Sequence, residues 1–345
     1  MVKLIIDTDP GVDDAFALSL AAMSPSVDLL AVTTVFGNVS LAATTSNTLR
    51  VLALCGREDV PVAIGAVRPL VHPQPRESKI AHGEDGLSGL AHTLPTRTRG
   101  VEPVDAVTLM ARVLEESPEP VTIAPIGPLT NIALLLAAHP GLKPKIERLV
   151  IMGGGLGGGN STAAAEFNFW CDPEAARRVV VEEDVPTVVV PIDLTYRCAV
   201  DGNWLSRLAS SGPIGASLEP LTAVYRAHYT QLLGTDTTIL HDAVAVAEAI
   251  NPGILATTRM PVSVETAFGP SRGALIGDRR MFAPEGVAGT REVDIASDTD
   301  LDAVRDFILR GLSPQDSRLP DDVGNDSFYS HPREHPLEGR AVDPG

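Results

Sequence analysis

The sequence predicts an α/β fold with a mainly parallel central sheet and helices on both faces. Short runs rich in apolar and β-branched residues alternate along the chain with longer segments of helical periodicity. The runs are almost continuously apolar, which is typical of strands buried on both faces. Strands that alternate with helices are joined by crossovers, and this order favours parallel pairing. The predicted strands are residues 3–7, 29–35, 121–126, 148–152 and 187–192.

Helical periodicity fills most of the intervals between these strands, at residues 13–23, 41–54, 105–116, 129–138 and 173–183. Further helices are predicted at 220–233, 242–250 and 301–310. Strand-like runs at 260–265, 273–277 and 291–295 form either a β-ribbon or added strands of the sheet. We expect residues 1–312 to form one domain. Residues 313–345 are rich in Pro, Asp and Gly and are predicted to be a mobile or loosely packed tail.

Charge and composition exclude several classes of partner. The formal net charge of −17 disfavours binding to nucleic-acid backbones and to anionic membranes. The three cysteines are widely spaced and predict reduced thiols rather than a disulfide framework or a zinc site. No apolar run reaches the roughly 18 residues of a membrane span, and the first apolar stretch is too short for a signal peptide. We therefore expect a cytoplasmic protein that binds neither nucleic acid nor membrane.

Four aspartates follow the first predicted strand within eight residues: Asp7, Asp9, Asp13 and Asp14. Four carboxylates this close repel one another if all are ionised, so protons, basic neighbours or a bound cation must compensate. Lys3 is the only basic residue nearby in the sequence, and oxygen ligands suit a hard divalent cation. N-capping with solvated charge accounts for one acid but not for four. Adjacent helical residues point about 100° apart, so we expect Asp13 and Asp14 to take different tasks.

Other polar residues follow the carboxyl ends of predicted strands, where open parallel sheets bind ligands. Asn38 is interpreted first as the N-cap of the next helix, with substrate binding as the alternative. The turn after Ile126 leaves its carbonyl free for a cation, or is an ordinary turn. Glu166 and Asn168 face the same way if their segment is extended, which suits the binding of sugar hydroxyls. Their presence on an exposed loop by chance is the alternative.

The pair His241-Asp242 opens a late predicted helix. Asp242 is either its N-cap or a metal ligand, and His241 is either a surface residue or a general acid. A helix N-terminus disfavours the imidazolium form of His241, whereas nearby acids favour it. The run from Gly153 to Gly159 lacks the prompt helix and the lysine of phosphate-binding loops. It predicts a mobile or closely approached loop.

Six segments in this order resemble the nucleoside hydrolases of the inosine-uridine-preferring type. They are residues 7–15 (DTDPGVDDA), 82–87 (HGEDGL), 127–131 (GPLTN), 152–154 (MGG), 166–168 (EFN) and 241–242 (HD). The resemblance extends from Lys3 to about Leu312. It implies a Ca²⁺-dependent enzyme that hydrolyses the N-glycosidic bond of ribonucleosides and releases ribose and the free base. It also implies a homo-oligomer, either a tetramer or a dimer.

The same resemblance implies roles for individual residues. Asp9, Asp14, Asp242 and the carbonyl of Ile126 are expected to bind Ca²⁺, and Asp9 also to act as general base on a water. His241 is expected to protonate the leaving base. The expected substrate-binding residues are Asp13, Asn38, His82, Met152, Asn160, Glu166, Asn168, Tyr225 and Tyr229. Carboxylates suit this chemistry because cleavage of the glycosidic bond develops positive charge on the ribose.

Base preference stays open between purine and pyrimidine, although the purine-specific branch of the family tends to have tryptophan at the position of His241. Two alternatives to the hydrolase remain. One is a Mg²⁺-dependent phosphatase with Asp7 as nucleophile, which leaves Glu166 and Asn168 without a role. The other is a nucleoside- or ribose-binding protein without turnover, against which the presence of Asp9 and His241 argues.

Overall fold

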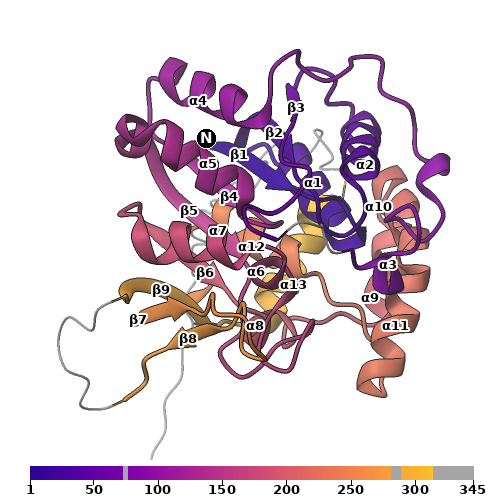
Figure 1. Ribbon diagram of the computed structural model, residues 1–345. Helices are drawn as coiled ribbons and strands as arrows, with labels where there is room; N and C mark the ends of the chain where they lie inside the picture. The colour runs from indigo at the N-terminus through magenta and orange to yellow at the C-terminus, as the bar shows by residue number, and fades with distance from the viewer. Residues whose placement is uncertain (73–76, 281–288, 314–345) are drawn as a thin grey trace, which may run out of the picture. The chain divides into compact units, whose positions relative to one another are not determined.

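Five parallel strands at the centre of the sheet match the strands that the sequence predicts. The structure, a computed structural model, describes residues 1–72, 77–280 and 289–313. The five are β1 (Val2–Thr8), β2 (Val27–Thr34), β4 (Val121–Pro125), β5 (Ile146–Met152) and β6 (Thr187–Val190) (Figure 1). They pair in parallel in the spatial order β2-β1-β4-β5-β6. The predicted α/β fold with a mainly parallel sheet is confirmed.

The strand-like runs near the C-terminus extend this sheet. They are β7 (Ala256–Val264), β8 (Leu275–Gly277) and β9 (Arg291–Asp298). β9 pairs in parallel with β6, and β7 pairs antiparallel with both β9 and β8. A short edge strand, β3 (Val62–Ile64), is too brief to show in the sequence pattern. In the described residues the sheet therefore has nine strands, in the order β3-β2-β1-β4-β5-β6-β9-β7-β8.

Helices cover both faces of the sheet because alternate strand residues point to opposite sides. Leu4 and Ile6 of β1 pack in one apolar cluster, whereas Ile5 packs in another. The first cluster contains α1 (Val12–Met23), α2 (Leu41–Leu54), α12 (His241–Ile250) and α13 (Leu301–Leu312). The second contains α4 (Ala106–Glu116), α5 (Thr130–Ala138) and α7 (Pro173–Arg177).

Shorter helices that the sequence pattern does not predict complete this part of the chain. They are α3 (Lys79–His82), α6 (Phe167–Cys171), α8 (Ile192–Thr195), α9 (Gly202–Ser210) and α10 (Pro213–Leu218). The helix predicted at 220–233 is a 3₁₀ turn followed by α11 (Ala223–Leu233). α11 packs against α3 (Figure 1), and α9 packs against α10.

The structure also bears on three further expectations from the sequence. Cys171 and Cys198 are buried and Cys55 is half-buried, and all three are reduced thiols, as predicted. None of the described helices combines the length and the apolar character needed to cross a membrane. The predicted tail, residues 313–345, lies outside the described residues apart from Ser313.

Candidate active site

Polar side chains meet beyond the carboxyl ends of β1, β2, β4 and β5, around a cavity of about 310 Å³. Residues from ten separate stretches of the described chain line this cavity, so only the fold brings them together. The predicted site residues that line it are Asp13, Asn38, His82, Ile126, Met152, Asn160, Glu166, Asn168, Tyr225, Tyr229, His241 and Asp242. Asp9 and Asp14 are fully buried and are not among the described lining residues.

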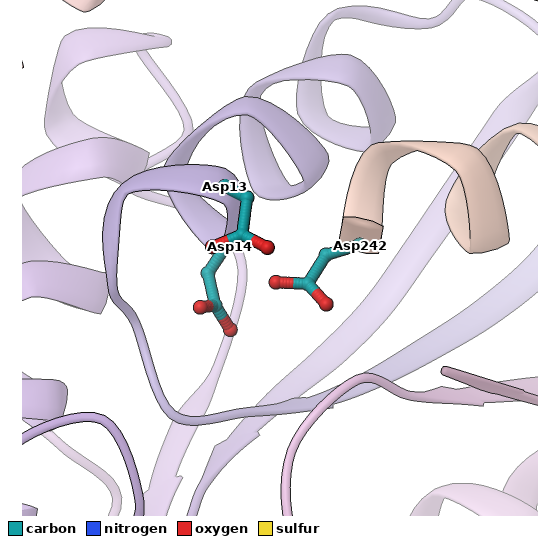
Figure 2. Close-up of side chains that lie close together, drawn as sticks. All are labelled: Asp13, Asp14 and Asp242. Atoms are coloured by element: carbon teal, nitrogen blue, oxygen red, sulfur yellow. The ribbon is translucent and has the colours of Figure 1, made fainter. Parts of the chain in front are cut away.

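Three carboxylates converge where the first turn of α1 meets the first turn of α12. Oxygen atoms of Asp13, Asp14 and Asp242 lie within 4.8 Å of one another, and Figure 2 shows the three groups gathered in one place. Asp13 and Asp14 converge although their positions on the helix diverge by about 100°. Asp14 turns back over the loop that precedes α1, which brings its carboxylate to the same place. We name Asp9, Asp13, Asp14 and Asp242 the acidic cluster.

Hydrogen bonds from the loop after β1 fix the carboxylate of Asp14. Its Oδ2 accepts from the backbone N–H of Gly11 (2.9 Å), as the third residue of a capping box at the start of α1. Its Oδ1 accepts from the hydroxyl of Thr8 (2.5 Å) and from the backbone N–H of Asp9 (3.3 Å). A carboxylate with this many donors has its orientation set before any ligand arrives.

Asn38 joins Asp9 to Asp14. Its backbone N–H donates to Asp9 Oδ2 (2.8 Å), and its Nδ2 donates to Asp14 Oδ2 (3.1 Å). Ser40, not Asn38, caps α2, so the N-cap interpretation of Asn38 is wrong. Asp9 is enclosed by two turns: a Cβ on Gly37 would lie 1.8 Å from Asp9 Oδ2. Within the described part of the chain, Asp9 is not one of the three carboxylates that converge within 4.8 Å.

Burial disfavours the ionised form of the carboxylates in the acidic cluster. Desolvation raises the pKa of Asp13 to about 8, and it also raises the pKa values of Asp9, Asp14 and Asp242. No lysine or arginine among the described residues lines the cavity. Asp13 Oδ1 is buried and accepts no hydrogen bond from any residue that the structure describes. A buried oxygen without a donor, beside two further carboxylates, fits a divalent cation with oxygen ligands.

Asp7 is separate from this cluster. Its Oδ1 accepts from the Thr33 hydroxyl (2.6 Å) and from Asn131 Nδ2 (2.8 Å). Asn131 also donates to the carbonyl of Thr34 (3.0 Å) and accepts from the backbone N–H of Ala66 (2.8 Å). Asp7 is fully buried and is not among the described lining residues, so it is not placed to attack a substrate there. It supports the strand ends, which contradicts the phosphatase alternative.

Glu166 and Asn168 lie on the cavity wall next to the end of β5. Glu166 is the N-cap of α6, and its Oε1 accepts from the backbone N–H of Asn168 (2.9 Å). The prediction of an extended segment is therefore wrong, although both side chains line the cavity. Asn168 Nδ2 donates to the carbonyl of Ile126 (3.0 Å), and burial raises the pKa of Glu166 to about 7. Asn160 is exposed, and its Oδ1 accepts from the backbone N–H of Phe167 (2.9 Å).

His241 has a partner on each ring nitrogen. Nδ1 lies 2.6 Å from Thr195 Oγ1, and Nε2 lies 3.0 Å from the Tyr229 hydroxyl. Burial lowers the pKa of His241 to about 3, so the ring is neutral. Leu240 is the N-cap position of α12 and Asp242 lies in the first turn, so the N-cap interpretation of Asp242 is wrong.

His82 completes this part of the wall. Its Nδ1 accepts from the backbone N–H of Val12 (3.1 Å), and burial lowers its pKa to about 3. Its ring lies against Tyr225 with centroids 4.9 Å apart, and Tyr225 lies at the same distance from Tyr229. We name His82, Tyr225, Tyr229 and His241 the histidine–tyrosine cluster. Its members come from α3, α11 and α12.

Several lining residues escape the sequence-based prediction, notably Tyr196 and Trp170. Tyr196 packs edge-on against His241 with centroids 5.4 Å apart, directly after Thr195. A signal for Tyr196 was present, because its segment follows the predicted strand 187–192 as other site residues follow their strands. Asp193 in the same segment accepts from the backbone N–H of Leu156 and Gly157 (2.8 Å each) and so holds the glycine-rich loop.

Comparison with known proteins identifies the family. The family model described as inosine-uridine preferring nucleoside hydrolase matches residues 4–306. The chain belongs to this family. The pyrimidine-specific ribonucleoside hydrolase RihA of Citrobacter koseri is 40% identical over 299 residues, which cover 85% of this chain and 94% of that protein. RihA of Escherichia coli O8 is 40% identical over 310 residues, covering 88% and 97%.

Solved structures agree with this membership. A plant nucleoside hydrolase, PpNRh1, superposes with a TM-score of 0.85 at 31% identity and covers 91% of this chain and 99% of its own. An inosine-guanosine nucleoside hydrolase superposes with a TM-score of 0.81 at 30% identity, covering 91% and 99%. The protein described here is thus an enzyme that hydrolyses ribonucleosides. Asp13, Asp14 and Asp242, which converge at the cavity, could hold a metal ion.

Proposed function

We propose that this nucleoside hydrolase is Ca²⁺-dependent and acts preferentially on pyrimidine ribonucleosides. One observation carries the proposal: buried acids without a cationic neighbour and a neutral, hydrogen-bonded histidine line the same cavity. The metal would be held by Asp9, Asp14, Asp242 and the carbonyl of Ile126. Asp14 and Asp242 already converge, Asn38 joins Asp14 to Asp9, and the carbonyl of Ile126 has a second lone pair beyond its bond from Asn168.

A hard cation there would neutralise the carboxylates, bind ribose hydroxyls and acidify a water. The chain itself supplies the remaining parts of the reaction. Asp9 takes the proton of the attacking water. Asp13, Asn160, Glu166 and Asn168 orient the ribose through its hydroxyls. The same acids stabilise the positive charge that develops on the sugar as the glycosidic bond breaks.

The leaving base needs a proton, because it is a poor leaving group as an anion. His241 is the group proposed to deliver it, with Tyr229 on its Nε2 and Thr195 on its Nδ1. The two partners hold the ring in one orientation toward the cavity. The ring is neutral before substrate binds, so a hydroxyl partner, Tyr229 or Thr195, must pass a proton to one ring nitrogen as the other gives its proton to the base.

The pyrimidine preference rests on two supports. The relatives at 40% identity are named pyrimidine-specific, whereas solved structures at 28–30% identity are named purine-preferring or inosine-guanosine hydrolases. The second support is His241 itself, at the position where the purine-specific branch tends to have tryptophan. We further infer that the enzyme acts in the cytoplasm as a homo-oligomer, either a tetramer or a dimer. Light scattering on protein eluting from a size-exclusion column would measure the number of subunits.

Release of reducing sugar from a panel of uridine, cytidine, inosine, adenosine and guanosine tests the proposal. We expect hydrolysis of uridine and cytidine to exceed that of the purine nucleosides by at least about tenfold in kcat/KM. EDTA should abolish it and Ca²⁺ should restore it. Activity that survives exhaustive chelation would refute the calcium dependence. Equal or higher kcat/KM for purine nucleosides would refute the pyrimidine preference.

A further inference from the structure

The turn at Ser88 has an uncommon backbone conformation. Over residues 1–72, 77–280 and 289–313, Ser88 is the single non-glycine residue with positive φ, at 57°. Such a conformation disfavours residues with a Cβ and persists where the surroundings determine it, often at functional sites. Ser88 follows His82 by six residues, in the segment that leads away from the cavity wall.

Asp85 holds this turn. Its Oδ1 accepts from the backbone N–H groups of Leu87 (2.9 Å) and Gly89 (2.7 Å), and its Oδ2 accepts from that of Ala91 (2.9 Å). Partial burial raises the pKa of Asp85, but these hydrogen bonds outweigh it and leave the pKa below its usual value. The carbonyl of Asp85 also accepts from Asn47 Nδ2 (2.8 Å), which ties the turn to α2.

The N-terminus of α11 lacks a cap from its own chain segment. The preceding residue, Thr222, donates its hydroxyl to the carbonyl of Glu219 (2.8 Å) and does not cap the helix. Ser88 Oγ accepts instead from the backbone N–H of Val224 (3.1 Å), the second residue of α11. The same hydroxyl donates to the carbonyl of Leu221 (2.6 Å). The first N–H groups of a helix have no partner within the helix, and Ser88 accepts a hydrogen bond from one of them in α11.

Ser88 contacts two of the three segments that carry the histidine–tyrosine cluster. Its backbone N–H donates to the carbonyl of His82 (2.8 Å), at the end of α3. Its hydroxyl binds the first turn of α11, directly before Tyr225, and Tyr229 follows one helical turn later. The ring of His82 meets the ring of Tyr225 between these two attachments. Ser88 therefore links the end of α3, at His82, to the start of α11.

We propose that Ser88 is a positioning residue. It caps α11 from a distant segment of the same chain and holds Tyr225 and Tyr229 in place to receive the base. The inference rests on the proposed function where it speaks of the base. The cap itself is a structural claim, and it is tested without any substrate.

Amide hydrogen exchange on the full-length protein tests the cap. Ser88→Gly removes the hydroxyl, while glycine adopts a φ of 57° without strain. We expect the amides of Val224 and Tyr225 to exchange roughly five- to tenfold faster, in line with the loss of an N-cap. The control is Asp105→Ala, which removes the cap of α4 (Asp105 Oδ1 to Thr108 N–H, 2.8 Å). It should accelerate exchange in α4 alone. Unchanged exchange in α11 of Ser88→Gly would overturn the proposal.

Ser88→Ala separates the hydroxyl from the backbone. Alanine also lacks the hydroxyl but is strained at this φ. Faster exchange in α11 of both variants supports the cap. Faster exchange in Ser88→Ala alone would assign the effect to backbone strain and overturn the role of the hydroxyl.

Kinetics test the consequence for the base. Ser88→Gly should lower kcat/KM for uridine roughly five- to tenfold, chiefly through KM. Hydrolysis of 4-nitrophenyl riboside, whose leaving group needs no proton, should stay within about twofold of the wild type. An equal loss on both substrates would overturn the base-positioning role. A wild-type enzyme inactive on every nucleoside would refute the proposed function, and the exchange measurement would still decide the cap.

Discussion

The acidic cluster and the histidine–tyrosine cluster share one cavity but are held in place by different means. Asp9 and Asp14 accept backbone N–H groups from the loops that end β1 and β2, so the sheet itself orients them. His241 and Tyr229 are oriented by each other and by Thr195. His82 and Tyr225 depend on the packing of α3 against α11. In the acidic cluster, Asp9 and Asp14 are held at the carboxyl ends of the strands, whereas the histidine–tyrosine cluster is assembled from separate helices.

The difference suggests a division of labour. Chemistry common to every ribonucleoside involves the ribose and the attacking water, and it benefits from a rigid, charged site. Discrimination between substrates involves the base, because the base is the part that differs. The residues that contact the base therefore suit segments that can vary without disturbing the sheet. Substitutions in the acidic cluster should therefore affect all substrates alike, whereas those in the histidine–tyrosine cluster should depend on the leaving base.

The largest effect is expected from Asp9→Ala. Loss of the proposed general base and metal ligand should lower kcat/KM about 10³-fold or more on every nucleoside and also on 4-nitrophenyl riboside. The variant should remain folded by circular dichroism, because one buried acid is removed from a repelling group.

The control for Asp9→Ala is Asp28→Ala. Asp28 lies near the start of β2, at the opposite end of the sheet, in an ion pair with Lys3 (3.3 Å). Its loss should leave kcat/KM within about twofold of the wild type. Retained turnover in Asp9→Ala would remove the general-base role and break the proposed division between the clusters.

A smaller and selective effect is expected from His241→Ala. Loss of the proton donor should lower kcat/KM for uridine about 10²- to 10³-fold, and that for 4-nitrophenyl riboside about tenfold or less. His139→Ala, at the C-terminus of α5, is the control and should change neither value. A similar loss on both substrates would mean that His241 only positions the base.

The smallest effect concerns stability, through His82→Asn. Burial holds His82 neutral down to about pH 3, whereas the unfolded chain takes up its proton below about pH 6.5. Its contribution to folding is therefore fully present above pH 6.5 and is lost as the pH falls, by about 1.4 kcal/mol for each pH unit. Asparagine can accept the Val12 N–H through Oδ1 without titrating.

Chemical denaturation of metal-free protein between pH 6.5 and 4.5 measures this slope. The free energy of unfolding should fall less steeply with acid in His82→Asn than in the wild type. The exposed His92, changed to asparagine, serves as the control and should leave the slope unchanged. Identical slopes for wild type and His82→Asn would show that the folded protein already holds His82 protonated, against the picture of a neutral histidine–tyrosine cluster.

Sequence reasoning was most successful where local pattern and position in the fold coincide. The five central strands are buried on both faces, so their continuous apolar runs are visible, and the residues after them had to meet at one edge. It was least successful for short or irregular elements. α9 and β3 escaped it, and Glu166 proved to cap a five-residue helix where an extended segment was expected. Short elements owe their form to tertiary contacts rather than to periodicity.

By itself, the sequence determined that the central strands are parallel, that an acidic turn follows β1, and to which family the chain belongs. Only the tertiary structure decided which polar residues share an environment. It separated Asp7 from the acidic cluster, moved Asn38 from a capping role to a bridge between carboxylates, and brought Ser88 to the start of α11. The physical reason is that hydrogen bonds and burial depend on distances through space, and residues up to 136 positions apart supply them.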